Sequence, residues 1–432
     1  DYALGVIIFI VGLLISIALH EVGHLVPAKI FGVKVPEYFV GFGRTLWSTT
    51  RGETVYGIKA LPLGGYVRLA GMYPPASGEP ARKANGELTL AEEARADARA
   101  DLLPGEEDRA FSALTVPRKL VVMLGGPVMN LAIAAVLLTV MFTVIGSVPA
   151  YTSTIATVQP CLPAPDAVAC QEDDPASPAA AAGFEPGDTV VSWSGTPVFA
   201  WSDVTQLIRD GGTEPADVVV RRGGEEITLT VSPAELERPV IDDQGNPVVE
   251  GGVAVTEVVP YVGIGPRMEL ETQPLAAVPP VFWNATVQTL GLIPQLPVLL
   301  WDVAESLVTG EEREGGVLGP VGVGRAAGEI AATSSAVYGL EARVFDMLGL
   351  VASLNIALFA FNLIPLPPLD GGHVAGALVE GVRRGAARLT GRADPGPVDM
   401  ARALPLTYAV VALLIGMGVL LAVADIVRPV TF

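Results

Sequence analysis

Apolar residues gather in long runs along the chain, separated by polar stretches. Residues 1–31, 116–148, 341–371 and 404–428 each hold a long, mainly apolar run, and about 20 such residues in an α-helix cross the hydrocarbon core of a bilayer. We therefore predict a polytopic α-helical membrane protein with about four transmembrane helices. Residues 267–340 hold shorter apolar stretches broken by prolines, which favours amphipathic helices at the membrane surface.

The polar stretches differ from one another in pattern. Residues 32–71 contain short strand-like pieces separated by Arg51-Gly52 and Gly64-Gly65, which indicates a membrane-associated β-hairpin sheet. It would serve either as a lid or as an edge strand that pairs with an unfolded substrate. Residues 72–115 read as a solvated cytoplasmic loop and residues 372–403 as a basic one.

Composition and charge narrow the class of protein. Half of the residues are hydrophobic, only 17% are charged and the mean hydropathy is +0.49, which argues against a purely soluble protein. The net charge of −19 argues against a nucleic-acid partner, which would require a basic face.

The segments that join the apolar runs differ in charge, in a way that indicates which side of the membrane each one faces. Residues 29–44, 118–119 and 383–392 are basic, and residues 150–341 are strongly acidic. The positive-inside rule then places the first loop and the 372–403 loop in the cytoplasm, and both chain ends outside. The region from residue 150 to residue 341 then lies outside the cytoplasm, where oxidising conditions allow a disulfide between Cys161 and Cys170.

The motif His20-Glu21-Val22-Gly23-His24 lies near the end of the first apolar run. In a helix, residues four apart share a face, so the two histidines can bind one Zn²⁺ while Glu21 polarises a water. A soluble metalloprotease helix or a chance match would show the same residues. Ionisable side chains at membrane depth are costly and usually functional, so we predict a zinc site within the membrane.

Two further motifs lie in the second and third runs. Gly125-Gly126-Pro127-Val128-Met129-Asn130 would let another helix approach closely, and Asn130 would make either an interhelical hydrogen bond or a contact to substrate. The stretch from Asn362 to His373 breaks a membrane helix with three prolines. A catalytic zinc usually has three protein ligands, so Asp370 is the best third candidate, His373 is its competitor, and a metal-free Asp-Gly-Gly turn is the remaining reading.

Residues 149–266 form a polar, acidic region with the order strand, helix, strand, strand. Together with the turn from Gly183 to Asp188, this order resembles an extracytoplasmic PDZ domain of the bacterial protease type. Such domains offer a groove between a strand and a helix to an extended peptide. Here the domain would either bind peptide or act as a steric gate.

The three motifs and the PDZ-like insert, in this order, resemble the site-2 protease family of intramembrane zinc metalloproteases. The likeness covers nearly the whole chain and is greatest to the actinobacterial, mycobacterial-type members with a single PDZ domain. It implies that His20, His24 and Asp370 bind Zn²⁺ and that Glu21 is the general base. It also implies a multi-pass protein of the bacterial cell membrane.

The same resemblance implies how substrate is held. Asn130 and Asn362, with Gly126 and Pro365 of the same motifs, would contact or position the substrate, and the sheet over residues 54–70 would offer it an edge. The implied substrates are single-span membrane proteins such as anti-sigma factors, cut within or near the membrane after a first cut outside the cell.

Two other classes of protein remain open at this point. A membrane-anchored PDZ adaptor with a structural or vestigial metal site would have the same domains without catalysis. A transporter would explain the broken third helix, but inverted repeats are expected of it and the two halves show no internal similarity.

Overall fold

The computed structural model describes the whole chain except residues 76–80, 84, 86, 163–169, 171–173, 240–248, 251–252, 255, 311–312, 314–315, 334–338 and 431–432. The chain divides into two compact units. The helical unit comprises residues 1–144, 274–332 and 346–432. The sheet unit comprises residues 145–273 and 333–345.

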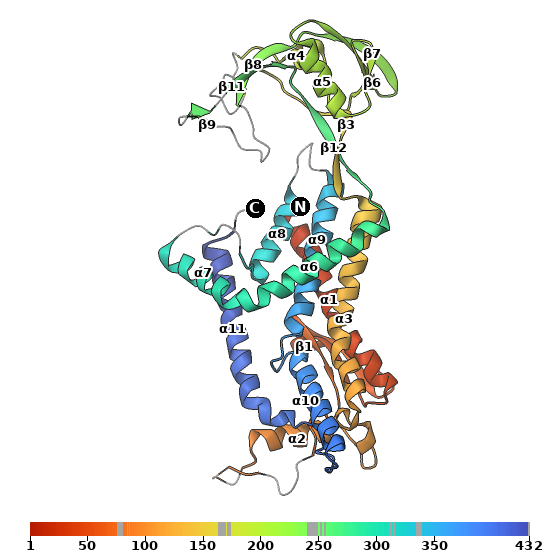
Figure 1. Ribbon diagram of the computed structural model, residues 1–432, viewed down its shortest axis with the longest axis vertical. Coiled ribbons are helices and arrows are strands. Elements are labelled where there is room, and N and C mark those ends of the chain that lie inside the picture. Colours follow the sequence, from red (N-terminus) through yellow and green to blue (C-terminus); the bar gives the residue numbers. More distant parts are fainter. Residues whose placement is uncertain are drawn as a thin grey trace. The chain divides into compact units, whose positions relative to one another are not determined.

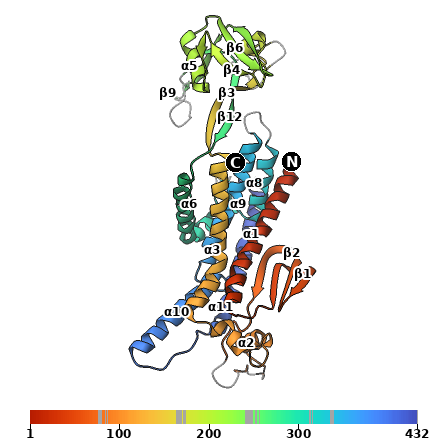
Figure 2. The ribbon, with the colours of Figure 1, turned by 90° about the vertical axis from the view of Figure 1, so that its right-hand side faces the viewer.

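The helical unit holds all of the long apolar helices. Its elements are α1 (Tyr2–Ile30), β1 (Glu37–Arg51), β2 (Thr54–Arg68), α2 (Leu90–Ala100), α3 (Val116–Val140), α6 (Val278–Leu292), α7 (Leu296–Thr309), α8 (Pro320–Ala332), α9 (Leu340–Asn362), α10 (Asp370–Leu389) and α11 (Leu404–Val427). The first turn of α9 is assigned to the sheet unit. Figure 1 and Figure 2 show α1, α3 and α9 packed along their lengths, with both chain termini near one end of this unit.

Among the residues that the structure describes, five segments are long and apolar enough to cross a membrane. Four are the predicted spans: Tyr2–Ile30, Val116–Ile145, Leu340–Asn362 and Met400–Val427. Their outward side chains are large and apolar, as lipid contact requires; Leu413 and Ile415 of α11 are 67% and 63% exposed. The chain is a multi-pass membrane protein.

The fifth segment, Leu275–Thr309, adds one candidate by length and composition to the four that the sequence predicted. Its prolines had suggested short, interrupted pieces. In the structure Pro279, Pro294 and Pro297 occupy the second position of α6, of the short 3-10 helix and of α7. Pro280 occupies the third position of α6, so all four lie in a first turn, where an N–H has no partner within the helix. The prolines therefore begin helical pieces and do not break them, and the segment is helical almost throughout.

This segment nevertheless begins and ends at the same end of the helical unit. Gly310, directly after α7, lies against the Arg428 side chain, directly after α11. Just before the segment, Glu271 accepts a hydrogen bond from Ser147 N–H, which follows the apolar run of α3. The opposite ends of α3 and α11 meet at Glu380, so α6 and α7 do not connect the two ends of the unit. Figure 1 shows α6 running obliquely across the other helices.

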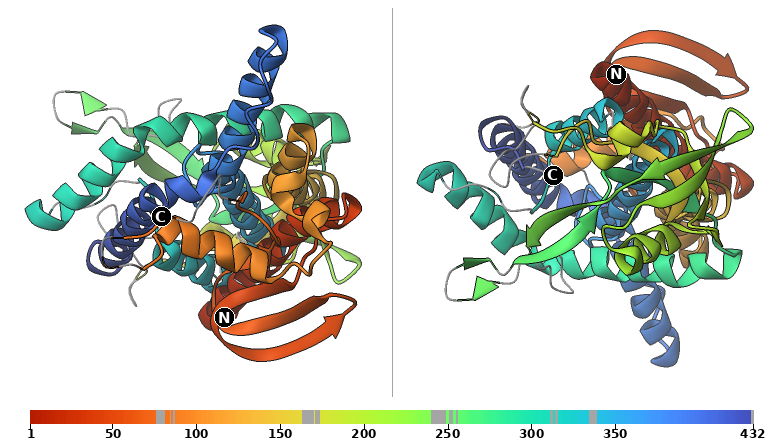
Figure 3. Two further views of the ribbon diagram at one scale, coloured as in Figure 1. Left: turned by 90° about the horizontal axis from the view of Figure 1, so that it is seen from below. Right: turned by 90° about the horizontal axis from the view of Figure 1, so that it is seen from above.

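The predicted hairpin over residues 32–71 is a small sheet with four paired segments. Both β1 and β2 bend, so Glu37–Val40 pairs on one side with residues 55–58 and on the other with residues 65–68. Figure 3 shows the hairpin beside α1 at the edge of the helical unit. Its last segment, residues 65–68, is an edge of the sheet, and Gly65 lies against α1.

The sheet unit contains the shorter strands and two short helices. Its elements are β3 (Val148–Val158), α4 (Pro178–Ala182), β4 (Thr189–Trp193), β5 (Thr196–Pro197), α5 (Trp201–Gly211), β6 (Ala216–Arg222), β7 (Glu225–Val231), β8 (Ala234–Pro239), β9 (Val249–Glu250), β10 (Val253–Ala254), β11 (Thr256–Tyr261) and β12 (Ile264–Glu271). The main sheet has the order β12-β3-β4-β6-β7, with β5 paired to β4, and β8 pairs separately with β11.

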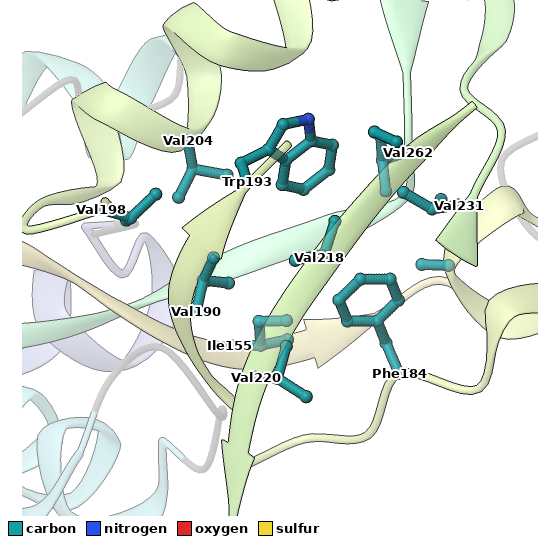
Figure 4. Packing of buried hydrophobic residues seen from close by; sticks show 12 residues of the cluster. Ile155, Phe184, Val190, Trp193, Val198, Val204, Val218, Val220, Val231 and Val262 are labelled. Atoms are coloured by element: carbon teal, nitrogen blue, oxygen red, sulfur yellow. The ribbon is translucent and has the colours of Figure 1, made fainter. Parts of the chain in front are cut away.

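One apolar core holds this unit together. Val204 of α5 packs with Val190, Trp193 and Val218 of the sheet, and Phe184 packs with the same cluster (Figure 4). A disulfide joins Cys161 and Cys170. The predicted bounds of 149–266 lie within this unit.

A buried ion pair fixes the turn that precedes β4. Asp188 has no solvent exposure, accepts two hydrogen bonds from Arg222 at 2.7 and 2.8 Å, and accepts another from Glu185 N–H at 2.9 Å. Burial alone would raise the pKa of this carboxyl, but the hydrogen bonds and the charge of Arg222 hold the pKa below its usual value.

We predict that Asp188→Asn destabilises the sheet unit by about 1–3 kcal/mol at neutral pH, because the amide has one acceptor oxygen in place of two and the Arg222 guanidinium loses its charged partner. A lowered carboxyl pKa stabilises the fold above the unfolded-state value of about 3.9 and loses that effect as pH falls further. Hydrogen exchange of the full chain should therefore show a difference between variant and wild type that shrinks below about pH 4. Asp210→Asn, on the exposed face of α5, is the control; equal exchange in all three proteins would contradict the prediction.

Candidate metal centre

Three side chains from two helices converge at the crossing of α1 and α3. His20 and His24 extend from α1, and Asp370 is the first residue of α10. Nε2 of each histidine lies 3.3 Å from Oδ2 of Asp370, and the two Nε2 atoms lie 3.3 Å apart. This group is the candidate metal-binding cluster found within the described residues.

The triangle of these three atoms fits a tetrahedral metal. Zn²⁺ binds imidazole nitrogen and carboxylate oxygen at about 2.0–2.1 Å, so the ligand atoms of a tetrahedral site lie about 3.3 Å apart. That separation is found on all three edges of the triangle. Two neutral imidazoles and one carboxylate are donors that zinc prefers, and a fourth position stays open. The residues present therefore fit a catalytic zinc.

Each histidine is oriented through its other ring nitrogen. His24 Nδ1 lies 2.8 Å from the carbonyl oxygen of Val122 on α3, which fixes the proton on Nδ1 and leaves Nε2 free to bind a metal. His20 Nδ1 lies 3.1 Å from the side-chain amide of Asn130, which is fully buried. The Asn130 Oδ1 atom has no hydrogen-bond partner among the described residues.

The Asn130 oxygen and the nearby His20 ring nitrogen can form a hydrogen bond with each other. When His20 Nε2 binds a metal, Nδ1 carries a hydrogen and needs an acceptor. Rotating the amide by half a turn, which exchanges atoms of nearly equal size, places Oδ1 against that hydrogen. The Asn130 amide then orients the first zinc ligand.

Glycines make room for the site where α1 crosses α3. A Cβ added at Gly23 would lie 2.3 Å from the Gly125 oxygen, and one at Gly125 would lie 1.9 Å from the Gly23 oxygen. A Cβ at Gly126 would lie 2.2 Å from His24 Nε2 and 2.7 Å from His20 Nε2. Gly126 therefore faces the metal ligands, and any side chain at this position would fill the space that a metal needs.

The loop before α10 positions Asp370. Gly371 and Gly372 let the preceding turn fold back on the helix, because a Cβ at either residue would lie within 2.5 Å of the backbone of residues 363–367. Gly372 N–H donates to Leu369 O at 2.9 Å. The sequence Asp-Gly-Gly thus fixes where the carboxylate enters the site, and the predicted turn and the predicted ligand are the same feature.

Glu21 lies between the two histidines and the edge of the small sheet. Its carboxylate lies beside the backbone N–H of Val67, and its Cγ would lie 3.1 Å from a Cβ placed at Gly65. Tyr38 donates its hydroxyl to Ala18 O at 2.8 Å. Burial raises the pKa of Tyr38 to about 12, with the Glu21 charge adding to it, so the phenol keeps its proton.

Two of the predicted substrate residues lie outside the ligand triangle. The Asn362 side chain donates to Leu358 O in its own helix at 3.0 Å. Pro365 is exposed in the turn between α9 and α10. His373, the competitor of Asp370, lines a small cavity of about 20 Å³ with Lys119 and Glu380 and does not belong to the triangle.

Sequence reasoning missed some of the residues that shape the site. Asn355 of α9 is fully buried and donates to Ser16 Oγ at 2.9 Å, one turn before His20 on α1. Its only signal in the sequence was a polar residue in an apolar run. The contact of Val67 with Glu21 had no signal, because it depends on how the sheet packs against α1.

Comparison with known proteins gives consistent matches over most of the chain. The profile of Peptidase family M50 matches residues 8–393. The zinc metalloprotease Rip1 of Mycobacterium tuberculosis is 32% identical, covering 99% of this chain and 98% of its own length. A putative zinc metalloprotease of Brucella suis is 30% identical over 88% of this chain and 86% of its own. The metalloprotease MmpA of Caulobacter vibrioides is 27% identical over 88% of each.

The contact of Asn130 with His20 gives a prediction that separates its two possible roles. If the amide oxygen orients His20, Asn130→Ala should weaken zinc binding about 10–100-fold, whereas Asn130→Asp keeps an acceptor and should retain zinc. A residue that only contacts substrate would leave zinc binding unchanged in both variants. Competition with a fluorescent chelator in the purified full-length protein measures the affinity.

Proposed function

Because this chain belongs to peptidase family M50 and is a zinc metalloendopeptidase, we propose that His20, His24 and Asp370 hold its Zn²⁺ and that Glu21 is the general base. The observation that supports this assignment is the ligand triangle, whose 3.3 Å edges match a tetrahedral zinc site. The family match and the complete ligand set favour an active protease over an inactive PDZ adaptor.

The residues around the triangle supply the remaining chemistry. Zinc, when bound, polarises a carbonyl and acidifies a water. Glu21 accepts the proton of the attacking water and delivers it to the leaving amine. The backbone N–H of Val67 lies beside the Glu21 carboxylate. Asn130 and the Val122 carbonyl keep the two imidazoles oriented.

The edge of the small sheet suits an extended substrate. Carbonyl groups within a helix are shielded by their own hydrogen bonds, so a membrane helix must unwind before it can be cut. Residues 65–68 form an edge of the sheet beside Glu21, and an edge strand can pair with an extended peptide. In this proposal a substrate adds to that edge and its scissile bond lies over the zinc.

The substrates we propose are membrane-spanning segments of single-span proteins, with anti-sigma factors as the expected class. The site lies on apolar helices, and lipid-exposed apolar side chains surround it. The end of the helical unit where α3 and α11 begin carries basic residues, including Arg109, Arg118 and Arg383. By the positive-inside rule this end faces the cytoplasm of a bacterial cell, and both termini and the sheet unit face outward.

We propose further that the sheet unit is a PDZ domain that admits or binds extended chains. A cavity of about 550 Å³ lies between α5 and the turn from β11 to β12. Trp201, Thr205 and Ile208 line its helix side, and Gly263 and Ile264 line its strand side. A helix and a strand facing each other across a groove are the elements with which PDZ domains hold a peptide.

We expect Glu21→Gln to bind zinc like the wild type and to lose cleavage by roughly 10²–10⁴-fold, because the amide cannot accept the proton. The measurement is cleavage of a single-span substrate in proteoliposomes, with zinc content determined on the same samples. Glu225→Gln, an exposed change on β7, is the matched control. Cleavage at the wild-type rate in Glu21→Gln would remove Glu21 from the mechanism.

Exchange of the third ligand distinguishes Asp370 from His373. Asp370→Ala removes one corner of the triangle, so zinc should be lost from the purified protein. His373→Ala should keep one zinc per chain, because His373 lies outside the triangle. Elemental analysis of both variants is sufficient, and the reverse pattern would assign the third position to His373.

A further inference from the structure

Helix α10 buries a carboxylate and exposes most of its large apolar side chains. Glu380 is 2% exposed, whereas Val382 is 73% and Leu389 is 91% exposed. Leu378 and Val379 are each about half exposed. A helix on the surface of a soluble protein shows the opposite distribution. The outer face of α10 is therefore suited to lipid.

Polar contacts, not the apolar face, hold α10 on the helical unit. Glu380 accepts hydrogen bonds from Lys119 of α3 at 2.8 Å and from Val398 N–H at 3.2 Å. Arg384 lies 3.2 Å from the other Glu380 oxygen. Val374, near the start of α10, packs against the apolar core of the helical unit. Further along the helix, Leu378, Val382 and Leu389 are more than half exposed and need another partner.

The position of α10 along the membrane spans identifies that partner. Gly381 lies against Val116, the first residue of one candidate span, and Gly376 lies against Met400, the first residue of another. The middle of α10 is thus at the level where two spans enter the bilayer. Figure 3 shows the rest of α10 projecting sideways beyond the other helices.

Arginines border the apolar face on both sides. At 100° per residue, Leu378, Val382 and Leu389 lie on one stripe of the helix, with Arg383 on one flank and Arg388 on the other. Both arginines are exposed. An apolar stripe flanked by arginines is the arrangement of helices that lie in the interface of anionic membranes. This local positive charge contrasts with the net charge of −19 for the whole chain.

We propose that α10 lies in the headgroup–acyl boundary of the bilayer, with Arg383 and Arg388 bound to the phosphates of anionic phospholipids. Because α10 begins at Asp370, this contact anchors the helix that supplies the third metal ligand. The proposal depends on the chain being a membrane protein and not on its protease activity.

Spin labels on the full-length protein test the depth of α10. Val382→Cys and Leu389→Cys can be labelled selectively, because Cys161 and Cys170 are joined in a disulfide. In liposomes that contain phosphatidylglycerol, both labels should be accessible to oxygen and protected from a water-soluble nickel chelate. Leu413→Cys on α11 is the lipid-facing reference, and Glu87→Cys in the loop before α2 is the water-facing reference.

The outcomes are distinct. Labels that behave like the one at residue 413 support the proposal, and labels that behave like the one at residue 87 overturn it. Labels protected from both reagents would show that protein covers this face, which also overturns it. The double change Arg383→Gln with Arg388→Gln should abolish most of the difference in depth between liposomes with and without phosphatidylglycerol. Arg221→Gln, in the sheet unit, should leave that difference intact.

Discussion

Where α1 crosses α3, the two backbones are too close for a side chain at Gly23 or at Gly125. That contact brings the helix with both histidines against the helix with their hydrogen-bond partners. It also places Gly126 against the ligand nitrogens, where the lack of a side chain leaves room for a metal. The geometry of the site thus follows from the absence of a few methyl groups.

The same crossing explains how a polar site exists among apolar helices. Polar groups at membrane depth are costly unless they are paired. Here Val122 O and the Asn130 amide occupy the outer nitrogens of the two imidazoles, and Asp370 lies between the inner ones. Zinc would complete this pairing, and the backbone N–H of Val67 lies beside Glu21. The site is therefore a closed hydrogen-bonded network with one open position.

The grouping of His20, His24 and Asp370 was predictable from the sequence. His20 and His24 share a helical face wherever the helix lies, and Asp370 was singled out by the need for a third ligand. The contacts of Asn130 and Val67 were not predictable, because they depend on how separate segments pack. The prolines of α6 and α7 misled for a related reason: their position within a helix, and not their number, decides whether they interrupt it.

The most direct test of the metal centre is zinc K-edge X-ray absorption on the purified, zinc-loaded protein. The structure predicts four light ligands at about 2.0–2.1 Å with outer-shell scattering from two imidazoles, those of His20 and His24. Scattering from three imidazoles would place His373 in the site in the position assigned to Asp370. That result would contradict the ligand triangle on which this account of the protease depends.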